Sequence, residues 1–275
     1  SSICGAITYD KFKKNNNWNN VVIEECIDGT LINLFFYKDS WRLSTKFCID
    51  ANNSKFRSND SFYKLFNDIV DIKTIDFDTK FTYSFVLVHE KNRNITPVYN
   101  NTIYHIESTN NLTGERVNID LGFLKPKIFK FSNIINTFNI NSYEELENFK
   151  FKSWKNPGFM IYNSDRSERT KINNSLFKEI ENLIKNQNNF KFIFLKNLNN
   201  SDNIQKLLEC YPEHKQLYLD LYNLFTTIIM EVHSLYIKIR VNKRNNIKVN
   251  KKYKKILYNL HGLYLNKIKK NTNFK

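Results

Sequence analysis

The stretch LINLFFYKDSWRLSTK, residues 31–46, decides the fold of the first part of the chain. Its first half, Leu31–Tyr37, is an apolar run. Its last six residues, Trp41–Lys46, alternate between apolar and polar side chains, as strands with one buried face do. Lys38-Asp39-Ser40, which lies between the two halves, is a turn signal. The stretch therefore predicts a β-hairpin.

Short strands and capped helices continue this pattern on both sides of the hairpin. Further strands are predicted at Val21–Glu25, Phe81–His89, Thr102–Glu107, Phe159–Tyr162 and Thr170–Ile172, the last two as a pair. Ser61 can cap a helix with an apolar face, and Asn174 can cap another that runs to about Lys185. The polar, asparagine-rich segment 11–20 predicts a loop.

The last third of the chain has a helical character. A short helix is followed by a long one from Pro212 to about residue 240, in which leucine and isoleucine recur every three or four residues. A basic loop and a last helix follow, and we expect the apolar stripe of the long helix to pack against the last one. The sequence thus predicts a mainly β, α+β body over residues 1–190 and an all-helical domain with a basic tail over residues 191–275.

The chain is strongly basic. Lysine and arginine outnumber aspartate and glutamate by 42 to 27, which gives a net charge of +15. A field of this sign favours nucleic acid or another polyanion as a partner. The alternative is a solvated surface with surplus lysine, because basic residues are spread along the chain. They are densest near the C-terminus, at Lys238, Arg240, Lys243, Arg244, Lys248, Lys251, Lys252, Lys254 and Lys255.

The cysteines and the apolar runs indicate the setting of the protein. The four cysteines form no Cys-x-x-Cys pair and have no spacing to histidine that suits zinc, so no metal site is expected. Reduced thiols are the simplest account of them. No apolar run reaches about 18 residues, so no membrane span is expected. We therefore expect a cytoplasmic protein that does not contact membranes.

One motif precedes the hairpin. The segment Glu24–Ile32, EECIDGTLI, resembles motif I of the covalent nucleotidyltransferases, which are the DNA and RNA ligases and the mRNA capping enzymes. Their signature is Lys-x-Asp-Gly followed by an apolar strand. The chain is most similar to the tRNA-repair type of phage and giant-virus RNA ligase, in which a strand resembling Trp41–Lys46 follows. The resemblance implies an antiparallel-sheet nucleotidyltransferase core, an ATP-grasp-like ligase fold, with an all-helical C-terminal domain.

Three later segments resemble further motifs of the same family in the same order. Ser84–Arg93 is similar to motif III, Pro157–Ile161 to motif IV and Lys171–Asn174 to motif V. The resemblance covers roughly residues 20–275.

Four positions depart from what the resemblance implies. The nucleophilic lysine of motif I is replaced by Cys26, and the glutamates of motifs III and IV are replaced by Val86 and Pro157. The second lysine of motif V is replaced by Asn173. Losing a nucleophile, a metal ligand and a phosphate clamp together leaves no route to phosphoryl transfer. We therefore expect neither catalysis nor a required cofactor, although a nucleotide could bind non-covalently.

Six retained residues are the candidate nucleotide-binding or RNA-binding set: Asp28, Gly29, Thr45, Lys46, Arg93 and Lys171. Gly29 is expected to supply a permissive backbone after the first strand. For Asp28 and Gly29 a role in the fold is the preferred interpretation. For Lys46, Arg93 and Lys171, a role in the fold and a role in binding an anion stay open.

The leading hypothesis is a catalytically inactive, RNA-ligase-like protein. It would bind RNA, either an RNA end or an mRNA cap, in the nucleotide cleft, within a viral RNA-processing or translation complex in the cytoplasm of an infected cell. The first alternative is a structural scaffold subunit that contacts proteins and no nucleic acid. The second is an active RNA ligase with a non-standard nucleophile, such as Cys26 or a neighbouring lysine.

Overall fold

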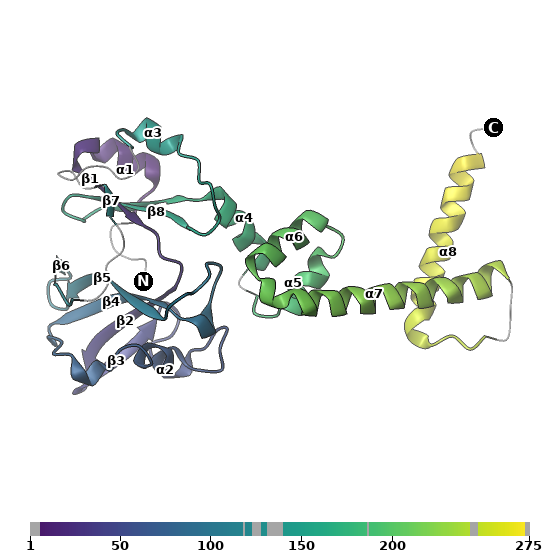
Figure 1. Ribbon diagram of the computed structural model, residues 1–275, viewed down its shortest axis with the longest axis horizontal. Helices are drawn as coiled ribbons and strands as arrows, with labels where there is room; N and C mark the ends of the chain where they lie inside the picture. Colours follow the sequence, from purple (N-terminus) through teal and green to yellow (C-terminus); the bar gives the residue numbers. More distant parts are fainter. Residues whose placement is uncertain are drawn as a thin grey trace. The chain divides into compact units, whose positions relative to one another are not determined.

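The computed structural model describes residues 6–117, 119–122, 128–130, 140–185, 187–242 and 247–272. The chain divides into two compact units, residues 1–188 and residues 189–275. The first unit holds two antiparallel sheets with short helices, and the second is helical (Figure 1). The expected α+β class, antiparallel sheets followed by a helical C-terminal region, is confirmed. Lys243 and Arg244 of the expected basic tail lie outside the described residues.

The larger sheet is built on the predicted hairpin. Its strand order is β3-β2-β4-β5-β6. The strands are β2 (Thr30–Tyr37), β3 (Ser40–Thr45), β4 (Phe81–Val88), β5 (Thr102–Asn110) and β6 (Arg116–Val117). In the turn, Lys38 and Asp39 have φ values of 47° and 56°, as a two-residue hairpin turn with the strands' own twist requires. The hairpin prediction is confirmed.

One face of this sheet forms the main hydrophobic core. Alternate residues of β2 and β4, including Leu34 and Phe85, point into it and are fully buried. Helix α2 (Phe62–Asn67) covers the face with Phe66, and the rings of Phe66 and Phe85 lie 5.5 Å apart. The Ser61 hydroxyl accepts a hydrogen bond from the Lys64 backbone N–H, so the predicted cap is confirmed.

The smaller sheet has the order β7-β1-β8-β9. Its strands are β1 (Val21–Glu25), β7 (Ile128–Lys130), β8 (Gly158–Asn163) and β9 (Arg169–Asn173). Gly158 opens β8 with a φ of +135°, and a side chain there would collide with the Ile172 carbonyl oxygen of β9. Helix α3 (Tyr143–Glu147) adds Leu146 to the core of this sheet, and helix α4 (Ser175–Ile184) starts at the predicted Asn174 cap.

The predicted loop at residues 11–20 is wrong in its first half. Helix α1 (Tyr9–Asn15) includes residues 11–15, and a turn of 3-10 helix follows at Trp18–Asn20. The physical reason is Phe12, which is fully buried against the smaller sheet. Together with Tyr9, which packs against the same core, Phe12 holds a helix whose other residues have the composition of a loop.

The second unit consists of helices. They are α5 (Phe190–Asn197), α6 (Ser201–Cys210), α7 (Lys215–Tyr236) and α8 (Lys251–Thr272), with a 3-10 turn at Pro212–His214 and a π-helical end of α7 at Ile237–Val241. Three turns of 3-10 helix complete the first unit: Ala51–Asn53, Ile72–Thr74 and Glu90–Asn92.

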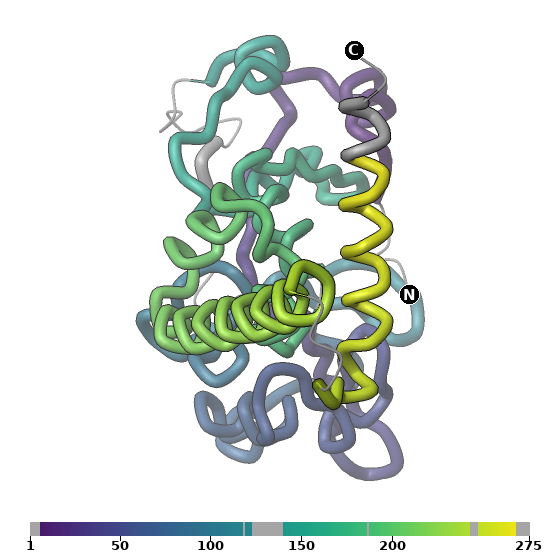
Figure 2. The backbone as a smooth tube through the Cα atoms, turned by 90° about the vertical axis from the view of Figure 1, so that its right-hand side faces the viewer, coloured from purple at the N-terminus to yellow at the C-terminus, as the bar shows by residue number. Residues whose placement is uncertain are grey.

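The expected packing of the long helix against the last one is only partly confirmed. Val232 of α7 is buried against Tyr253 and Leu257 of α8, and α8 meets α7 near its C-terminal end (Figures 1 and 2). The middle of α7 is not covered, since Leu224 is 57% exposed and Met230 is 66% exposed. The prediction was wrong there because periodicity places apolar residues on a face without saying what meets that face.

Candidate nucleic-acid interface

Cys26 lies where β1 ends, beside residues from the smaller sheet. Its backbone N–H donates to the Gly158 carbonyl at 3.1 Å, and its half-buried thiol contacts Lys171 of β9. Burial raises the pKa of the Cys26 thiol, and the nearby Lys171 ammonium only partly opposes this effect. The thiol is therefore protonated at neutral pH, and a protonated thiol is a poor nucleophile.

A cavity of about 250 Å³ opens at this point. Its walls are Cys26, Ile27, Asp28, Gly29, Phe56, Arg57, Asn94, Ile95, Pro157, Lys171, Phe177, Glu181 and Ile184. Segments that resemble ligase motifs I, IV and V contribute residues to these walls. Val86, from the segment that resembles motif III, lies against Gly29. Four segments that are distant in the sequence therefore converge here.

Asp28 is held by the segment that follows β4. Its carboxylate accepts hydrogen bonds from the backbone N–H groups of Ile95 and Thr96, at 2.9 and 2.7 Å, and from the Asn94 amide at 3.2 Å. These three bonds tie the start of β2 to residues more than 60 positions away. The geometry assigns Asp28 a role in the fold.

Gly29 is needed for space and not for backbone freedom. Its φ is not positive, so the expectation of a permissive backbone is wrong. A Cβ at this position would lie 2.5 Å from both the Leu87 carbonyl oxygen and the Val86 Cγ1 atom. Val86, where the resemblance to ligase motif III implies a glutamate, thus packs directly over Gly29.

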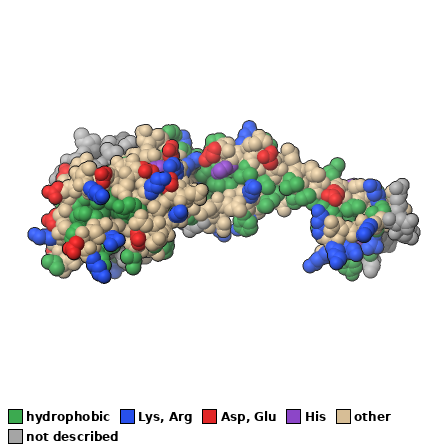
Figure 3. Space-filling view, turned by 90° about the horizontal axis from the view of Figure 1, so that it is seen from below, with side chains coloured by type: hydrophobic (Ala, Val, Ile, Leu, Met, Phe, Trp, Pro, Cys, Tyr) green, Lys and Arg blue, Asp and Glu red, His purple; other side chains and the backbone are tan. Residues whose placement is uncertain are grey.

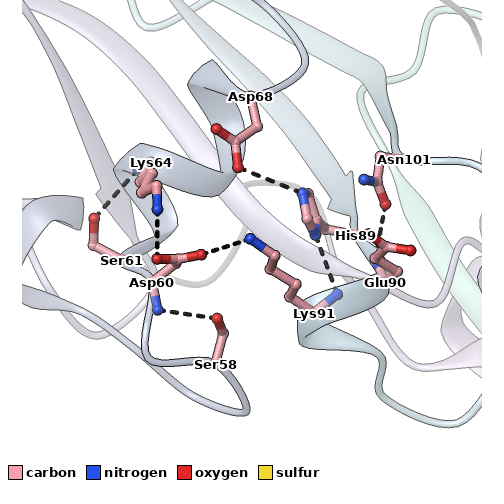
Figure 4. A network of polar contacts seen from close by, with 9 residues as sticks. All are labelled: Ser58, Asp60, Ser61, Lys64, Asp68, His89, Glu90, Lys91 and Asn101. Atoms are coloured by element: carbon pink, nitrogen blue, oxygen red, sulfur yellow. Dashed lines mark hydrogen bonds and ion pairs between the residues drawn. The ribbon is translucent and has the colours of Figure 1, made fainter.

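The segment after β4 is anchored by a polar network (Figure 4). Asp60 accepts from Lys64 of α2 at 2.7 Å and from Lys91 at 2.9 Å, and this pairing lowers the pKa of Asp60 to about 2. His89 is buried, and its Nδ1 atom accepts from the Lys91 backbone N–H at 3.2 Å. Burial lowers the pKa of His89, while Asp68 opposes the change. The network fixes the segment that carries the donors to Asp28.

Arg93 serves this segment as well. Its Nε and Nη2 atoms donate to the Ile95 carbonyl at 3.2 and 3.0 Å, and it does not line the cavity at Cys26. The neighbouring Arg57, which the sequence did not single out, does line that cavity and donates from Nη1 to the Asn94 carbonyl at 3.0 Å.

Thr45 and Lys46 lie at a second and larger cavity of about 870 Å³ between the two sheets. The Thr45 hydroxyl accepts from the Cys48 backbone N–H at 3.1 Å, which shapes the loop after β3. The Lys46 ammonium lies 5.3 Å from the centre of the Phe47 ring. The six candidate residues are therefore divided: Asp28, Gly29 and Lys171 line one cavity, Thr45 and Lys46 line the other, and Arg93 lines neither.

Three charged residues at the larger cavity have no signal in the sequence. Glu107 of β5 accepts from Arg116 of β6 at 3.3 Å and from Arg169 of β9 at 3.4 Å. These residues are separated by up to 62 positions and belong to no motif. Pairing of β5 with β6 brings Arg116 to Glu107, and the approach of the two sheets brings Arg169 there.

Two negative findings apply to the described part of the chain. No group of three or more histidine, cysteine, aspartate or glutamate side chains is placed there to hold a metal ion. No helix in that part is both long and apolar enough to cross a membrane.

The sequence is similar to a viral protein. It is 28% identical over 280 residues to a protein of Invertebrate iridescent virus 6 described as an immediate-early protein ICP-46 homolog. The alignment covers 94% of this chain, which spans 61% of the length of that relative. No protein-family profile matches the chain.

Two solved structures are partly similar to this chain. A protein described as a putative ATP-dependent DNA ligase from Aquifex aeolicus matches with a TM-score of 0.47 and 13% identity, over 86% of this chain and 67% of its own. An archaeal ATP-dependent RNA ligase matches with a TM-score of 0.42 and 7% identity, over 68% of this chain and 50% of its own.

Proposed function

We propose that the first unit binds RNA non-covalently at its cavities and forms no covalent nucleotide adduct. The observation that carries this proposal is the position of Cys26. A protonated, half-buried thiol lies beside Lys171 at the point where segments resembling four ligase motifs converge. The ligase-like geometry is retained, whereas the group that would attack a nucleotide is replaced.

The chemistry of the neighbouring positions supports the proposal. Val86 and Pro157 occupy the places of two carboxylates that the resemblance implies, and neither can bind a metal ion. Lys171 is exposed at the rim of the cavity and offers a charge to phosphate. Such an arrangement can hold an RNA end or a cap without reacting with it.

The second unit supplies a further basic surface. Lysine and arginine side chains gather around α8 and the end of α7 (Figure 3). The exposed members are Lys238, Arg240, Lys248, Lys251, Lys252, Lys254 and Lys255. Contacts of this kind bind the phosphate backbone without regard to sequence, and their strength falls steeply with salt.

Two assays on the full chain test the proposal. Incubation with labelled ATP or GTP and magnesium, followed by denaturing electrophoresis, is expected to give no labelled band. Single-stranded RNA is expected to bind with an affinity that falls with salt. Lys171→Ala is expected to weaken binding and to lower the salt slope by about 0.7, while Lys73→Ala, at an exposed lysine outside both cavities, leaves it unchanged.

The opposite results overturn the proposal in distinct ways. A labelled band shows that the chain is an active nucleotidyltransferase with a non-standard nucleophile. If RNA does not bind, or if its affinity does not change with salt concentration, RNA is not the partner of the first unit. The relative from an iridescent virus supports a viral setting for the chain. The proposal places its activity in a viral RNA-processing or translation complex in the infected-cell cytoplasm.

A scaffold role is the second candidate, and the exposed middle of α7 favours it. Leu224, Ile229 and Met230 are 57%, 49% and 66% exposed, and apolar side chains at this density are found where a protein partner binds. A scaffold without RNA binding predicts that Met230→Gln disrupts assembly while leaving any RNA affinity at background.

A further inference from the structure

The floor of the larger cavity carries polar side chains beside the apolar Leu31 and Phe35. Along β2, Ile32 and Leu34 point into the hydrophobic core, whereas Asn33 lies on the opposite face and lines the cavity. Ser84 of the neighbouring strand β4 does the same, and its hydroxyl donates to the Asn33 side-chain oxygen at 2.9 Å. A sheet face that carries amides and hydroxyls beneath a second sheet cannot form a dry core. It is suited to hydrogen bonding with a ligand.

The wall of the cavity carries two arginines that pair with one carboxylate, and one of these arginines is buried. Arg116 and Arg169 share the single carboxylate of Glu107. Arg169 is only 2% exposed, and its Nη2 atom has no hydrogen-bond partner among the described residues. Glu115 and Asp165 also line the cavity, but both are exposed to solvent, which screens their charge. A buried guanidinium that lacks a full set of partners favours an anion beside it.

The mouth of the cavity carries an exposed aromatic ring. Phe47 lies on the loop that follows β3 and is 91% exposed, and Ile49 on the same loop is 82% exposed. The loop is held by the hydrogen bond from the Cys48 backbone N–H to the Thr45 hydroxyl. An exposed ring with a lysine ammonium nearby is the arrangement on which single-strand binders stack bases.

From these three features we infer that the larger cavity is a nucleotide subsite. Phe47 stacks on the base, Asn33 and Ser84 offer hydrogen bonds to it, and Arg116 with Arg169 holds the phosphate. The volume of about 870 Å³ lies in the range of small-molecule sites. The inference rests on the proposed function in one respect, because the nucleotide is the terminal one of a bound RNA. A free mononucleotide shares the same chemistry.

The experiment measures binding of mononucleotides, nucleosides and short RNAs to the full chain by calorimetry. Phe47→Ala is expected to weaken mononucleotide binding about 5-fold to 150-fold, the loss of one stacked base. Arg116→Gln is expected to abolish the preference for a nucleotide over its nucleoside. Tyr99→Ala removes another aromatic ring, 80% exposed and outside the cavity, and is expected to bind as the unaltered chain does. Thermal melting verifies that each variant is folded.

The outcomes separate this inference from the proposed function. RNA binding that persists, with no effect of Phe47→Ala or Arg116→Gln on any ligand, overturns the subsite and leaves the proposed function intact. Mononucleotide binding that depends on Phe47, without RNA binding, supports the subsite and overturns the proposed function. RNAs with and without a terminal phosphate distinguish the two sources, because only a bound RNA end makes the affinity of the oligomer depend on Arg116.

Discussion

Replacing Asp28 tests how the start of β2 is held to the segment after β4. Asp28→Ala removes the acceptor of three hydrogen bonds, two of them from the backbone N–H groups of Ile95 and Thr96. Leaving a buried donor unsatisfied costs about 1–3 kcal/mol. Because Asp28 is only half-buried, water can replace part of the loss, so we expect the free energy of unfolding to fall by about 2–4 kcal/mol. This is a large share of the roughly 5–15 kcal/mol that stabilises a domain.

Tryptophan fluorescence is a suitable probe for this measurement. All three tryptophans, Trp18, Trp41 and Trp154, belong to the first unit, so urea unfolding followed by fluorescence reports on that unit alone. Asp28→Asn keeps one acceptor oxygen and is expected to lose about half as much stability. Asp39→Asn, in the exposed turn of the hairpin, is the matched control and should stay within about 0.5 kcal/mol. An Asp28→Ala variant as stable as this control would refute the reasoning.

Three further predictions follow from the same structure. Gly158→Ala is expected to destabilise the first unit by about 2–5 kcal/mol, because a φ of +135° strains any residue with a side chain and the new methyl group collides with the Ile172 carbonyl. The shift of the urea unfolding midpoint measures this loss. Burial lowers the pKa of His89, so the unfolded chain takes up its proton first, and the free energy of unfolding should fall as the pH drops below about 6.5. His89→Gln should flatten that decline in denaturation curves between about pH 5 and pH 7, and an unchanged slope would show that another group is responsible. The rate at which iodoacetamide alkylates Cys26, followed by peptide mass spectrometry, should have a pH midpoint above that of an ordinary cysteine, because burial raises the pKa of the thiol. Lys171→Ala should raise this midpoint further. A midpoint lowered by Lys171→Ala would contradict the described contact between the two side chains.

Features set by neighbouring residues could be predicted from the sequence. The hairpin of β2 and β3 follows from alternation on either side of a turn, and both signals lie within 16 residues. The caps at Ser61 and Asn174 are local as well, since each side chain accepts a hydrogen bond from a backbone N–H two or three residues later. Such signals need no knowledge of the rest of the chain.

Features that depend on distant contacts could not be predicted. Helix α1 forms because Phe12 meets the smaller sheet, and nothing in residues 9–15 announces that contact. The pair of arginines on Glu107 comes from three strands whose register is fixed only in the folded sheets. The sequence identified Lys46 by resemblance, but the cavity that it shares with Arg169 arises from the approach of one sheet to the other.

The tight contact at Gly29 changes what the Asp-Gly pair can tell about a relative of this chain. Asp28 fastens the segment after β4, and Gly29 leaves room for the main chain of β4 itself, so both residues serve the spacing of two strands. Selection for that spacing can keep the pair unchanged whether or not a chain transfers nucleotides. The presence of Asp-Gly therefore does not by itself mark a chain as active. The residue two positions before the aspartate, cysteine in this chain and lysine in the ligases that it resembles, is the informative one.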